Sequence, residues 1–440
     1  MANLKYRIKV ALASCSIAAG AEDVFAGLSR ELASVGKEEF LLQPTGCLGM
    51  CYCEPTVEIT TAGGERYIYG YVGAKDVKLL VEQHLLSDKP VDDLLVFSPR
   101  GHKEMENYFN KQVRIALKNC GVIQPESIDS YIEAEGYTGI KKALQKPADR
   151  IIADLKEAGL RGRGGAGFPT YLKLQLTREA EGKRKYVVCN ADEGDPGAFM
   201  DRSILESDPH SVIEGMLLCA YAIGAEHGYI YCRAEYPLAV QRLRLAITQA
   251  EAYQLLGNNI LGSGFNFHIE IREGAGAFVC GEETALLMSI EGRRGMPRFR
   301  PPYPAEKGLF NAPTCINNVE TLANIPRIIS GGPEVFNRYG TETSKGTKVF
   351  ALAGKINRGG LVEIPMGMTI DELVFHIGGG ISTGNDFKAI QTGGPSGGCI
   401  PAALKDTPVD YESLTKIGAI IGAGHLCCAI SMNSAFTITL

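Results

Sequence analysis

Hydrophobic and polar residues follow two kinds of period along the first 90 residues. Apolar positions alternate with polar ones in residues 6–12, which predicts a strand, and they recur at helical spacing in residues 21–35 before the helix stop signal Gly36. Further along, the pattern predicts three strands at residues 40–43, 56–60 and 66–72, and a helix at 74–86. The predicted order is strand, helix, three strands and helix.

Strands and helices alternate in a second region that begins near residue 146. Strand-like apolar runs cover residues 186–189, 229–233 and 267–272, and helical patterns cover 209–223 and 237–256. This alternation predicts helices packed on a mostly parallel sheet, in which ligands bind in the loops beyond the strand ends. Between the two regions, we expect a connecting segment with a helix at 107–117.

Composition excludes several classes of function. The 440 residues allow roughly three domains of about 150 residues each. The formal net charge is −5, so no overall basic surface indicates a nucleic-acid partner. No apolar run reaches the roughly 18–20 residues of a membrane helix, and the first residues do not resemble a secretory signal. We therefore expect a cytoplasmic protein, or a peripheral one, without membrane insertion.

The chain has 13 cysteines, which in a long cytosolic protein favour metal or redox chemistry over disulfides. Most stand singly among apolar residues, as small core residues do. Cys15, Cys47 and Cys51 fall in two predicted loops and are candidate metal ligands, with Cys53 close by. Iron–sulfur clusters normally use four thiolates. Two alternatives therefore stay open: a bound iron–sulfur cluster, or a domain that keeps its fold without the metal.

The stretch LRGRGGAGFPT, residues 160–170, is rich in glycine and arginine. Gly162, Gly164 and Gly165 allow backbone N–H groups to approach a ligand closely, and Arg163 lies between them. Such N–H groups form an anion-binding concavity that suits a phosphate. The spacing is neither GxGxxG nor a P-loop. A flexible surface loop is the alternative.

Two acidic loops follow strands of the second region. NADEGDPGAF contains Asn190, Asp192, Glu193 and Asp195, whose carboxylates are either solvated or paired with donors of a ligand. In GAFVCGEETAL, a glycine-rich turn leads into a helix that opens at residues 282–283. Acidic residues there either cap the helix or accept hydrogen bonds from ribose hydroxyls and repel a 2′-phosphate.

Two further segments bring ligand-type residues into the same region. MPRFRPPYP carries Arg298 and Arg300 on a proline-rich loop, and INNVETLAN places Asn317, Asn318 and Thr321 at a helix start. Five such loops in one region favour a shared site.

These motifs together resemble the family of flavin-binding, NADH-oxidising subunits of respiratory complex I, and even more its soluble relatives in NAD(P)-linked hydrogenases and formate dehydrogenases. The resemblance covers residues 105–425, and the first part resembles the thioredoxin-like 2Fe–2S ferredoxin domain. It implies an α/β fold with a thioredoxin-like domain (1–95), a connecting region (96–145), a central FMN- and NADH-binding α/β domain (146–335) and a β-grasp, soluble-ligand-binding domain (336–410).

The resemblance also implies roles for individual residues. It implies an FMN site built from Gly162, Arg163, Gly164, Gly165, Asn190, Asp192, Glu193, Phe278, Gly281, Glu282, Asn317, Asn318 and Thr321. It implies contacts to NADH for Phe168, Glu283 and Arg300, adds Lys173 to the cofactor-binding set, and places Glu193 and Asp195 closest to the reaction. No strong base or nucleophile is needed, because a flavin accepts a hydride and passes electrons on singly.

The end of the chain departs from this family. The family continues into a helical domain with a CGKC-x-PCR motif that binds a 4Fe–4S cluster, whereas this chain reads HLCCAISMNSAFTITL, residues 425–440. Adjacent Cys427 and Cys428 do not have cluster spacing. We expect residues 411–440 to be an aberrant tail from a truncated or frameshifted reading frame, without the 4Fe–4S ligands.

The expected function is that of an FMN-dependent NADH dehydrogenase subunit, which passes electrons from NADH to iron–sulfur partner subunits, with only diaphorase activity as it stands. An NADP-linked hydrogenase subunit and a non-catalytic assembly module are the alternatives.

Overall fold

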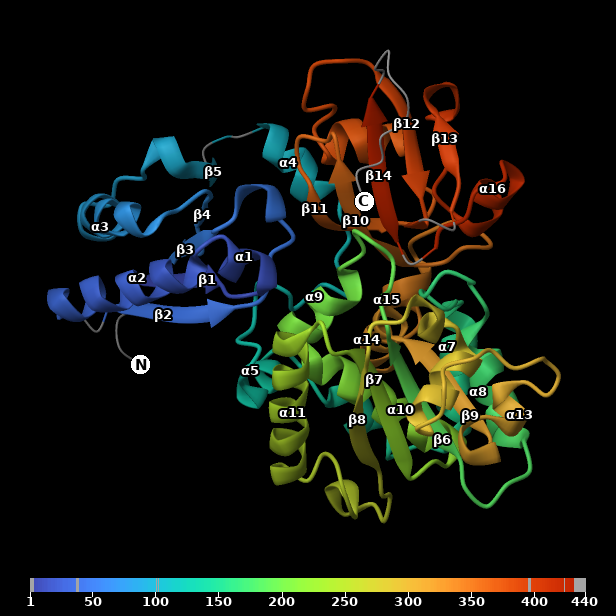
Figure 1. Ribbon diagram of the computed structural model, residues 1–440. Helices are drawn as coiled ribbons and strands as arrows, with labels where there is room; N and C mark the ends of the chain where they lie inside the picture. The colour runs from blue at the N-terminus through green and yellow to red at the C-terminus, as the bar shows by residue number, and fades with distance from the viewer. Residues whose placement is uncertain are drawn as a thin grey trace.

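The computed structural model describes residues 4–36, 39–99, 101, 103–394, 397–422 and 424–430. These residues form a mixed α/β structure with three sheets (Figure 1). The first sheet lies at the left of Figure 1, the second at the lower right and the third at the upper right. None of the helices in the described ranges is long and apolar enough to cross a membrane.

The first sheet has five strands in the order β2-β1-β3-β4-β5. They are β1 (Tyr6–Ala11), β2 (Phe40–Thr45), β3 (Val57–Thr61), β4 (Arg66–Tyr69) and β5 (Leu95–Phe97). The strand β2 is parallel to β1, and the other pairs are antiparallel. The structure has the strands expected from the period of two and adds β5.

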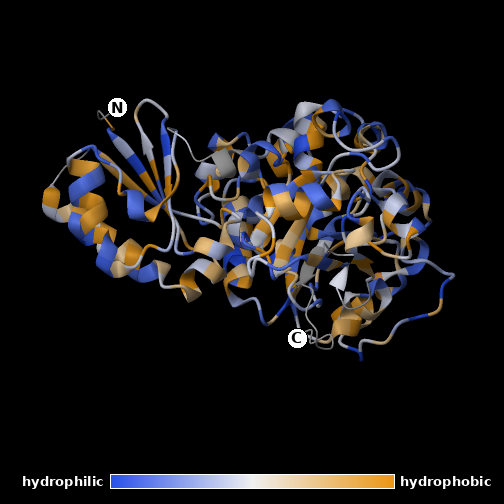
Figure 2. Ribbon diagram, turned by 90° about the horizontal axis from the view of Figure 1, so that it is seen from above, coloured by the Kyte–Doolittle hydropathy of each residue, from blue (hydrophilic) through white to orange (hydrophobic). Residues whose placement is uncertain are grey.

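Helices cover this first sheet. They are α1 (Ser14–Ala18), α2 (Ala21–Val35) and α3 (Val77–Leu79), which continues as a π-helix over Leu80–Leu86. Ile8 and Val10 of β1 are fully buried in one core with Val24 and Leu28 of α2. Hydrophilic and hydrophobic positions both occur along these strands and helices (Figure 2), as expected for elements with one buried face.

The connecting region differs from the expected helix at 107–117. The helix α4 spans Lys103–Asn110, and the chain then forms turns before α5 (Ile128–Glu133) and α6 (Thr138–Ala143). The buried carboxylate of Glu363 explains the difference, because it accepts hydrogen bonds from the backbone N–H groups of Ile115, Ala116 and Leu117 at 2.9–3.0 Å. These three N–H groups therefore do not form the backbone hydrogen bonds of an α-helix.

The second sheet is wholly parallel, in the order β8-β7-β6-β9. Its strands are β6 (Tyr186–Ala191), β7 (His227–Arg233), β8 (His268–Gly274) and β9 (Thr314–Asn318). The nearly continuous burial of β6 is typical of a strand covered on both faces. The expected parallel sheet is confirmed, with β9 as a strand that the sequence did not predict.

Helices pack on both faces of this sheet. They are α7 (Asp149–Ala158), α8 (Thr170–Glu179), α9 (Met200–Ser207), α10 (Pro209–Ile223), α11 (Pro237–Ala252), α12 (Glu283–Ile290), α13 (Pro304–Lys307), α14 (Val319–Gly331) and α15 (Glu334–Asn337). Nearly all of α10 is buried, and it forms one core with α14 and the sheet.

The third sheet includes residues that we expected to be an aberrant tail. Its order is β11-β10-β14-β12-β13, with β10 (Thr347–Gly354), β11 (Gly360–Pro365), β12 (Phe387–Thr392), β13 (Cys399–Pro401) and β14 (His425–Ile430), and with α16 (Tyr411–Lys416) beside it. The central strand β14 is parallel to β10 and antiparallel to β12. The sheet therefore extends past the expected boundary at 410, and the adjacent cysteines at 427 and 428 fall within β14. Residues 431–440 lie outside the described residues.

Candidate functional site

A cavity of about 1060 Å³ lies at the carboxyl end of the parallel sheet. Its walls come from the loops after β6 and β8, from the glycine-rich loop at 160–170 and from the third sheet. Among the residues expected to bind cofactor or act in the reaction, it brings together Gly164, Gly165, Asn190, Asp192, Glu193, Asp195, Phe278, Gly281, Glu282 and Asn318. Four of the five expected loops therefore share a cleft, whereas the loop that carries Arg298 and Arg300 does not line it.

The glycine-rich loop is held by its own hydrogen bonds. The N–H of Gly162 donates to the carbonyl oxygen of Phe168 at 2.8 Å, and the N–H of Thr170 donates to that of Leu160 at 3.0 Å. Gly165 has a φ of +117°, and a Cβ there would lie 3.2 Å from backbone carbons of Gly422. The loop is thus held at both ends, and its φ of +117° makes any residue other than glycine strained at position 165.

The side chain of Arg163 does not line the cavity, contrary to the expected FMN cradle. Its guanidinium is buried and donates to the backbone carbonyl oxygens of Arg161, Lys345 and Thr347 at 2.7–2.9 Å. The backbone N–H of Arg163 donates to the hydroxyl of Thr321 at 2.8 Å. Arg163 and Thr321 thus fix the loop from behind.

Asp192 is the most unusual carboxylate of the cavity. Both of its oxygens are buried, and within the described part of the chain neither has a hydrogen-bond partner. The nearest cation is Arg233, whose Nη1 lies 3.8 Å from Oδ1. Burial raises the pKa of Asp192 to about 6, against the opposing effect of Arg233. Asn190 positions this loop by donating from Nδ2 to the carbonyl oxygen of Gly281 at 2.9 Å.

Three further acidic residues surround the same space. Glu193 accepts hydrogen bonds from the backbone N–H groups of Asp201 and Arg202, at the start of α9. Asp201 accepts from Nδ2 of Asn318 at 2.6 Å through Oδ2. One oxygen each of Asp195 and Asp201 has no hydrogen-bond partner among the described residues. Burial raises the pKa of all three carboxyl groups.

Asp201 was missed by sequence reasoning. It lies in α9, just beyond the NADEGDPGAF motif, and no spacing rule singles it out. With Asp192 and Asp195 it brings four acceptor oxygens without hydrogen-bond partners to one cavity, counted over the described residues. A ligand with several hydroxyl or N–H donors fits such a wall.

Of the acidic pair at 282–283, only Glu282 has one of the two roles considered for it, that of helix cap. Glu282 caps α12 by accepting hydrogen bonds from the N–H groups of Thr284 and Ala285 at 2.9 Å, and it also lines the cavity. Glu283 pairs instead with Arg300, from Oε1 to Nη1 at 2.8 Å. The Glu283–Arg300 pair is partly exposed, and neither residue lines the cavity itself.

Other expected residues lie outside the cavity lining. Lys173 donates to the carbonyl oxygen of Ile316 at 2.8 Å, and buried Asn317 donates to the sulfur of Cys315 at 3.3 Å. Gly162 and Phe168 lie in the glycine-rich loop without reaching the cavity wall, and the ring of Phe168 is partly exposed. Asn318 contributes as the cap of α14, where its Oδ1 accepts from the N–H of Glu320.

The helix α16 supplies a wall that sequence reasoning missed. Tyr411, Glu412, Thr415 and Lys416 line the cavity, together with residues 420–422. Arg161 lies over the ring of Tyr411, 4.2 Å from its centroid, and pairs with Glu412 at 2.6 Å. Burial acts to raise the pKa of Glu412, but hydrogen bonds from Ser344 and Arg161 lower it to about 2. The sequence analysis assigned these residues to an aberrant tail, and no motif in them indicates a binding site.

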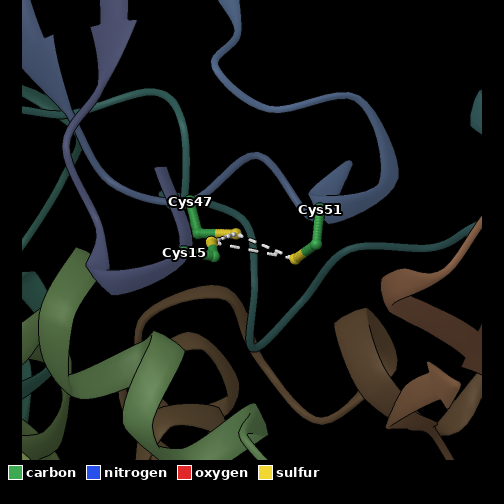
Figure 3. A group of neighbouring side chains, drawn as sticks. All are labelled: Cys15, Cys47 and Cys51. Carbon is green, nitrogen blue, oxygen red and sulfur yellow. Dashed lines mark hydrogen bonds between the residues drawn. The ribbon is translucent and has the colours of Figure 1, made fainter. Parts of the chain in front are cut away.

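The cysteines expected as metal ligands form a second group (Figure 3). The sulfur atoms of Cys15, Cys47 and Cys51 lie 3.8–4.0 Å from one another. The hydrogen bonds that Cys15 shares with Cys47 and Cys51 lower the pKa of Cys15 and raise the pKa values of Cys47 and Cys51. Cys53 is outside this group, and its sulfur lies 3.4 Å from the carbonyl oxygen of Met50.

The helix α9 connects the cysteine group to the cavity. At its start Asp201 lines the cavity, and at its end Ser207 accepts a hydrogen bond at Oγ from the N–H of Cys47 at 3.0 Å. Six residues of α-helix separate the two positions, a rise of about 9 Å. The neighbouring Glu206 also accepts hydrogen bonds from the backbone N–H and the hydroxyl of Ser14, next to Cys15.

The sulfur positions do not fit a two-iron cluster. Such a cluster takes four thiolates, two on each iron. Across the described ranges, three cysteine sulfurs meet, and all three distances between them are nearly equal. Thiolates bound to different irons are farther apart than thiolates on the same iron, because two metal atoms and their bridging sulfides lie between them.

A comparison with family models finds the Nuo51 FMN-binding domain, Complex1_51K, over residues 155–327. This range contains the parallel sheet and most of the cavity loops.

Curated relatives match over a longer stretch. The chain is 57% identical over 332 residues to the HndC subunit of the NADP-reducing hydrogenase of Solidesulfovibrio fructosivorans, a match that covers 74% of this chain and 68% of that protein. It is 47% identical over 310 residues to the F 2 subunit of the NADH-quinone oxidoreductase of Rhizobium meliloti (strain 1021), covering 70% of this chain and 74% of that protein.

Among solved structures, the chain is similar to an NAD⁺-reducing [NiFe]-hydrogenase in the H₂-reduced state. The TM-score is 0.61 at 28% sequence identity, and the match covers 98% of this chain and 69% of that one.

Proposed function

Since the chain belongs to the family of flavin-binding, NADH-oxidising subunits, we propose that it binds FMN in the cavity at the carboxyl end of the parallel sheet and oxidises NADH there. The electrons then pass singly to iron–sulfur subunits of a larger complex. The flavin supplies the chemistry that joins a two-electron hydride donor to one-electron acceptors, and the protein supplies binding and orientation.

The observation that carries this proposal is the set of unpartnered carboxylate oxygens in the cavity. Asp192, Asp195 and Asp201 present acceptors that are buried yet make no hydrogen bond to other described residues. FMN carries ribityl hydroxyls and a ring N–H group, which are donors of the kind these oxygens lack. An unpaired buried acceptor costs roughly 1–3 kcal/mol, so a ligand that satisfies several of them binds favourably.

The backbone provides the second part of the fit. Gly164 and Gly165 line the cavity where the loop approaches Asn318 and Gly422, respectively. A Cβ at Gly164 would lie 3.1 Å from the Cβ of Asn318. We assign FMN contacts to these glycines, to Asn190 and Asp192, and to Asn318, while Arg163 and Thr321 hold the glycine-rich loop in place.

The nucleotide binds toward the open side of the cavity in this proposal. Phe278 lines the cavity with a side chain that is 58% exposed, so its ring is free to pack against a planar ligand. The cavity volume of about 1060 Å³ is at the upper end for small-molecule sites and leaves room beside a flavin. Phe168 and the Glu283–Arg300 pair then contact the adenine and ribose end of NADH.

The remaining parts of the chain receive assignments on the same basis. We assign residues 1–95 to a thioredoxin-like domain, 96–145 to a connecting region, 146–335 to the FMN- and NADH-binding domain and 336–430 to a β-grasp domain. We place the protein in the cytoplasm as the electron-input subunit of a multi-subunit complex.

A second candidate is an NADP-linked hydrogenase subunit, favoured by the 57% identity to a relative of that name. The carboxylate of Glu283 argues for NADH, because it accepts ribose hydroxyls and repels a 2′-phosphate.

The test is an assay of the purified chain with ferricyanide as electron acceptor. We expect NADH oxidation that depends on added FMN and exceeds the rate with NADPH. A higher rate with NADPH supports the second candidate. FMN that binds without turnover supports a non-catalytic assembly module.

A further inference from the structure

The three sulfur atoms of Cys15, Cys47 and Cys51 form an almost equilateral triangle. The Cys15–Cys51 distance is 3.8 Å, and the other two distances are 4.0 Å. A tetrahedral metal ion with metal–sulfur bonds of about 2.3 Å holds its thiolates about 3.8 Å apart. The observed triangle therefore matches one face of the coordination tetrahedron of a single ion.

We propose that Cys15, Cys47 and Cys51 bind one zinc ion, with solvent as the fourth ligand. Thiolates are soft ligands that select zinc over harder cations such as magnesium and calcium. Cys47 is buried, whereas Cys15 and Cys51 are partly exposed, so water reaches the open side of the triangle. The proposal is independent of FMN binding, because the cysteine group lies outside the cavity lining.

Hydrogen bonds from neighbouring groups hold the proposed cysteine ligands in place. The N–H of Gly49 donates to the sulfur of Cys47 at 3.2 Å. Hydrogen bonds of this kind orient the ligands of a metal and raise its affinity. The N–H of Cys47 is held in turn by Ser207.

The site also lies where the three sheets meet. Ser14 and Cys47 contact the end of α9 through Glu206 and Ser207. The N–H of Leu361, in the third sheet, donates to the carbonyl oxygen of Gly49 at 2.9 Å. A metal that fixes these loops therefore stabilises the attachment of the first sheet to the rest of the chain. Zinc has no redox chemistry in proteins, so this site carries no electrons and they leave the flavin by another route.

The experiment is zinc titration of the full chain, purified metal-free under reducing conditions, followed by metal analysis and thermal unfolding. We expect one zinc ion per chain and a raised melting temperature, since a ligand that binds only the folded state stabilises it. Cys47→Ser should weaken zinc binding by more than about 10-fold and abolish the shift. Cys53→Ser and Cys399→Ser are matched controls that should retain both, because neither sulfur belongs to the group.

Other outcomes overturn the proposal. Reconstitution with ferrous iron and sulfide that yields a two-iron, two-sulfide centre, lost in Cys47→Ser, establishes a cluster instead. Loss of zinc in Cys53→Ser shows a different ligand set. Failure of the wild-type chain to bind zinc removes the site altogether. FMN content, measured on the same samples, reports separately on the proposed function.

Discussion

The hydroxyl of Tyr411 donates a hydrogen bond to the carbonyl oxygen of Gly162 at 2.8 Å. Tyr411 begins α16, whereas Gly162 belongs to the glycine-rich loop almost 250 residues earlier. The contact closes one side of the cavity, since other residues of both segments line it. The third sheet is thus part of the proposed flavin site and not a separate appendage.

Replacing Tyr411 by Phe should weaken FMN binding by up to about five-fold. The substitution removes one hydrogen bond, worth about 1 kcal/mol, while the ring stays on Arg161. The measurement is the dissociation constant of FMN. Tyr253→Phe is the control, because that hydroxyl bonds Asp129 on the surface. Equal effects of the two variants would argue against α16 as a wall of the site.

Replacing Arg163 by Lys should lower the free energy of unfolding by about 3 kcal/mol. The ammonium group of lysine cannot donate hydrogen bonds to all three carbonyl oxygens that the buried guanidinium of Arg163 binds. Buried carbonyl groups without a hydrogen bond lower the stability of the fold. Denaturant unfolding measures the change. Arg244→Lys, at an exposed pair with Glu273, should change it by less than about 0.5 kcal/mol. A stable Arg163→Lys variant with weak FMN binding would instead indicate direct contact with the ligand.

The Asp192→Asn variant should be more stable than the wild type above about pH 6 in the absence of FMN. Burial raises the folded-state pKa of Asp192 from 3.8 to about 6. The unfolded chain therefore loses this proton first, and the wild type loses stability as the pH rises from about 4 to about 6. Asparagine has no such titration. The difference in melting temperature between the variant and the wild type should grow across this interval and stay constant above it.

The same substitution should weaken FMN binding, since it replaces an acceptor oxygen by a donor. If the difference in stability between Asp192→Asn and the wild type does not change with pH, the pKa of Asp192 is not raised in the folded protein. Unchanged FMN affinity would remove Asp192 from the proposed site.

Replacing Glu283 by Gln should narrow the preference for NADH over NADPH by about 10-fold, equivalent to about 1.4 kcal/mol. The change removes the negative charge proposed to lie beside the ribose and removes the closer of the two carboxylate partners of Arg300, which favours contact of Arg300 with a 2′-phosphate. The measurement is kcat/KM for both nucleotides. Glu273→Gln, whose partner is Arg244, is the control. An unchanged ratio would exclude Glu283 from nucleotide selection.

Local patterns predicted three of the four strands of the parallel sheet, of which β6 and β7 are short and nearly continuously buried. They also located the loops of the cavity, since loops after such strands converge at one edge of the sheet. Asn190 and Asp192 could therefore be assigned together from the sequence. The motif spacing placed the start of α12 at residues 282–283, and the helix begins at Glu283 with Glu282 as its cap.

Features that depend on distant contacts could not be predicted in this way. Residues 111–117 favour a helix locally, but the carboxylate of Glu363 binds their N–H groups. Arg163 resembles a phosphate ligand in sequence, whereas its acceptors lie mostly in and beside β10. Strand β14 pairs with β10 although more than 70 residues of sequence separate the paired positions, and no local pattern predicts this pairing.

The central claim is tested most directly by titrating the purified chain with FMN and then adding NADH without oxygen. We expect one FMN bound per chain, in a yellow complex whose flavin colour is bleached by a stoichiometric amount of NADH. We also expect Gly165→Val to prevent binding, because a side chain there meets the backbone of Gly422. A folded wild-type chain that binds no FMN, or whose bound FMN keeps its colour with NADH, would contradict the central claim.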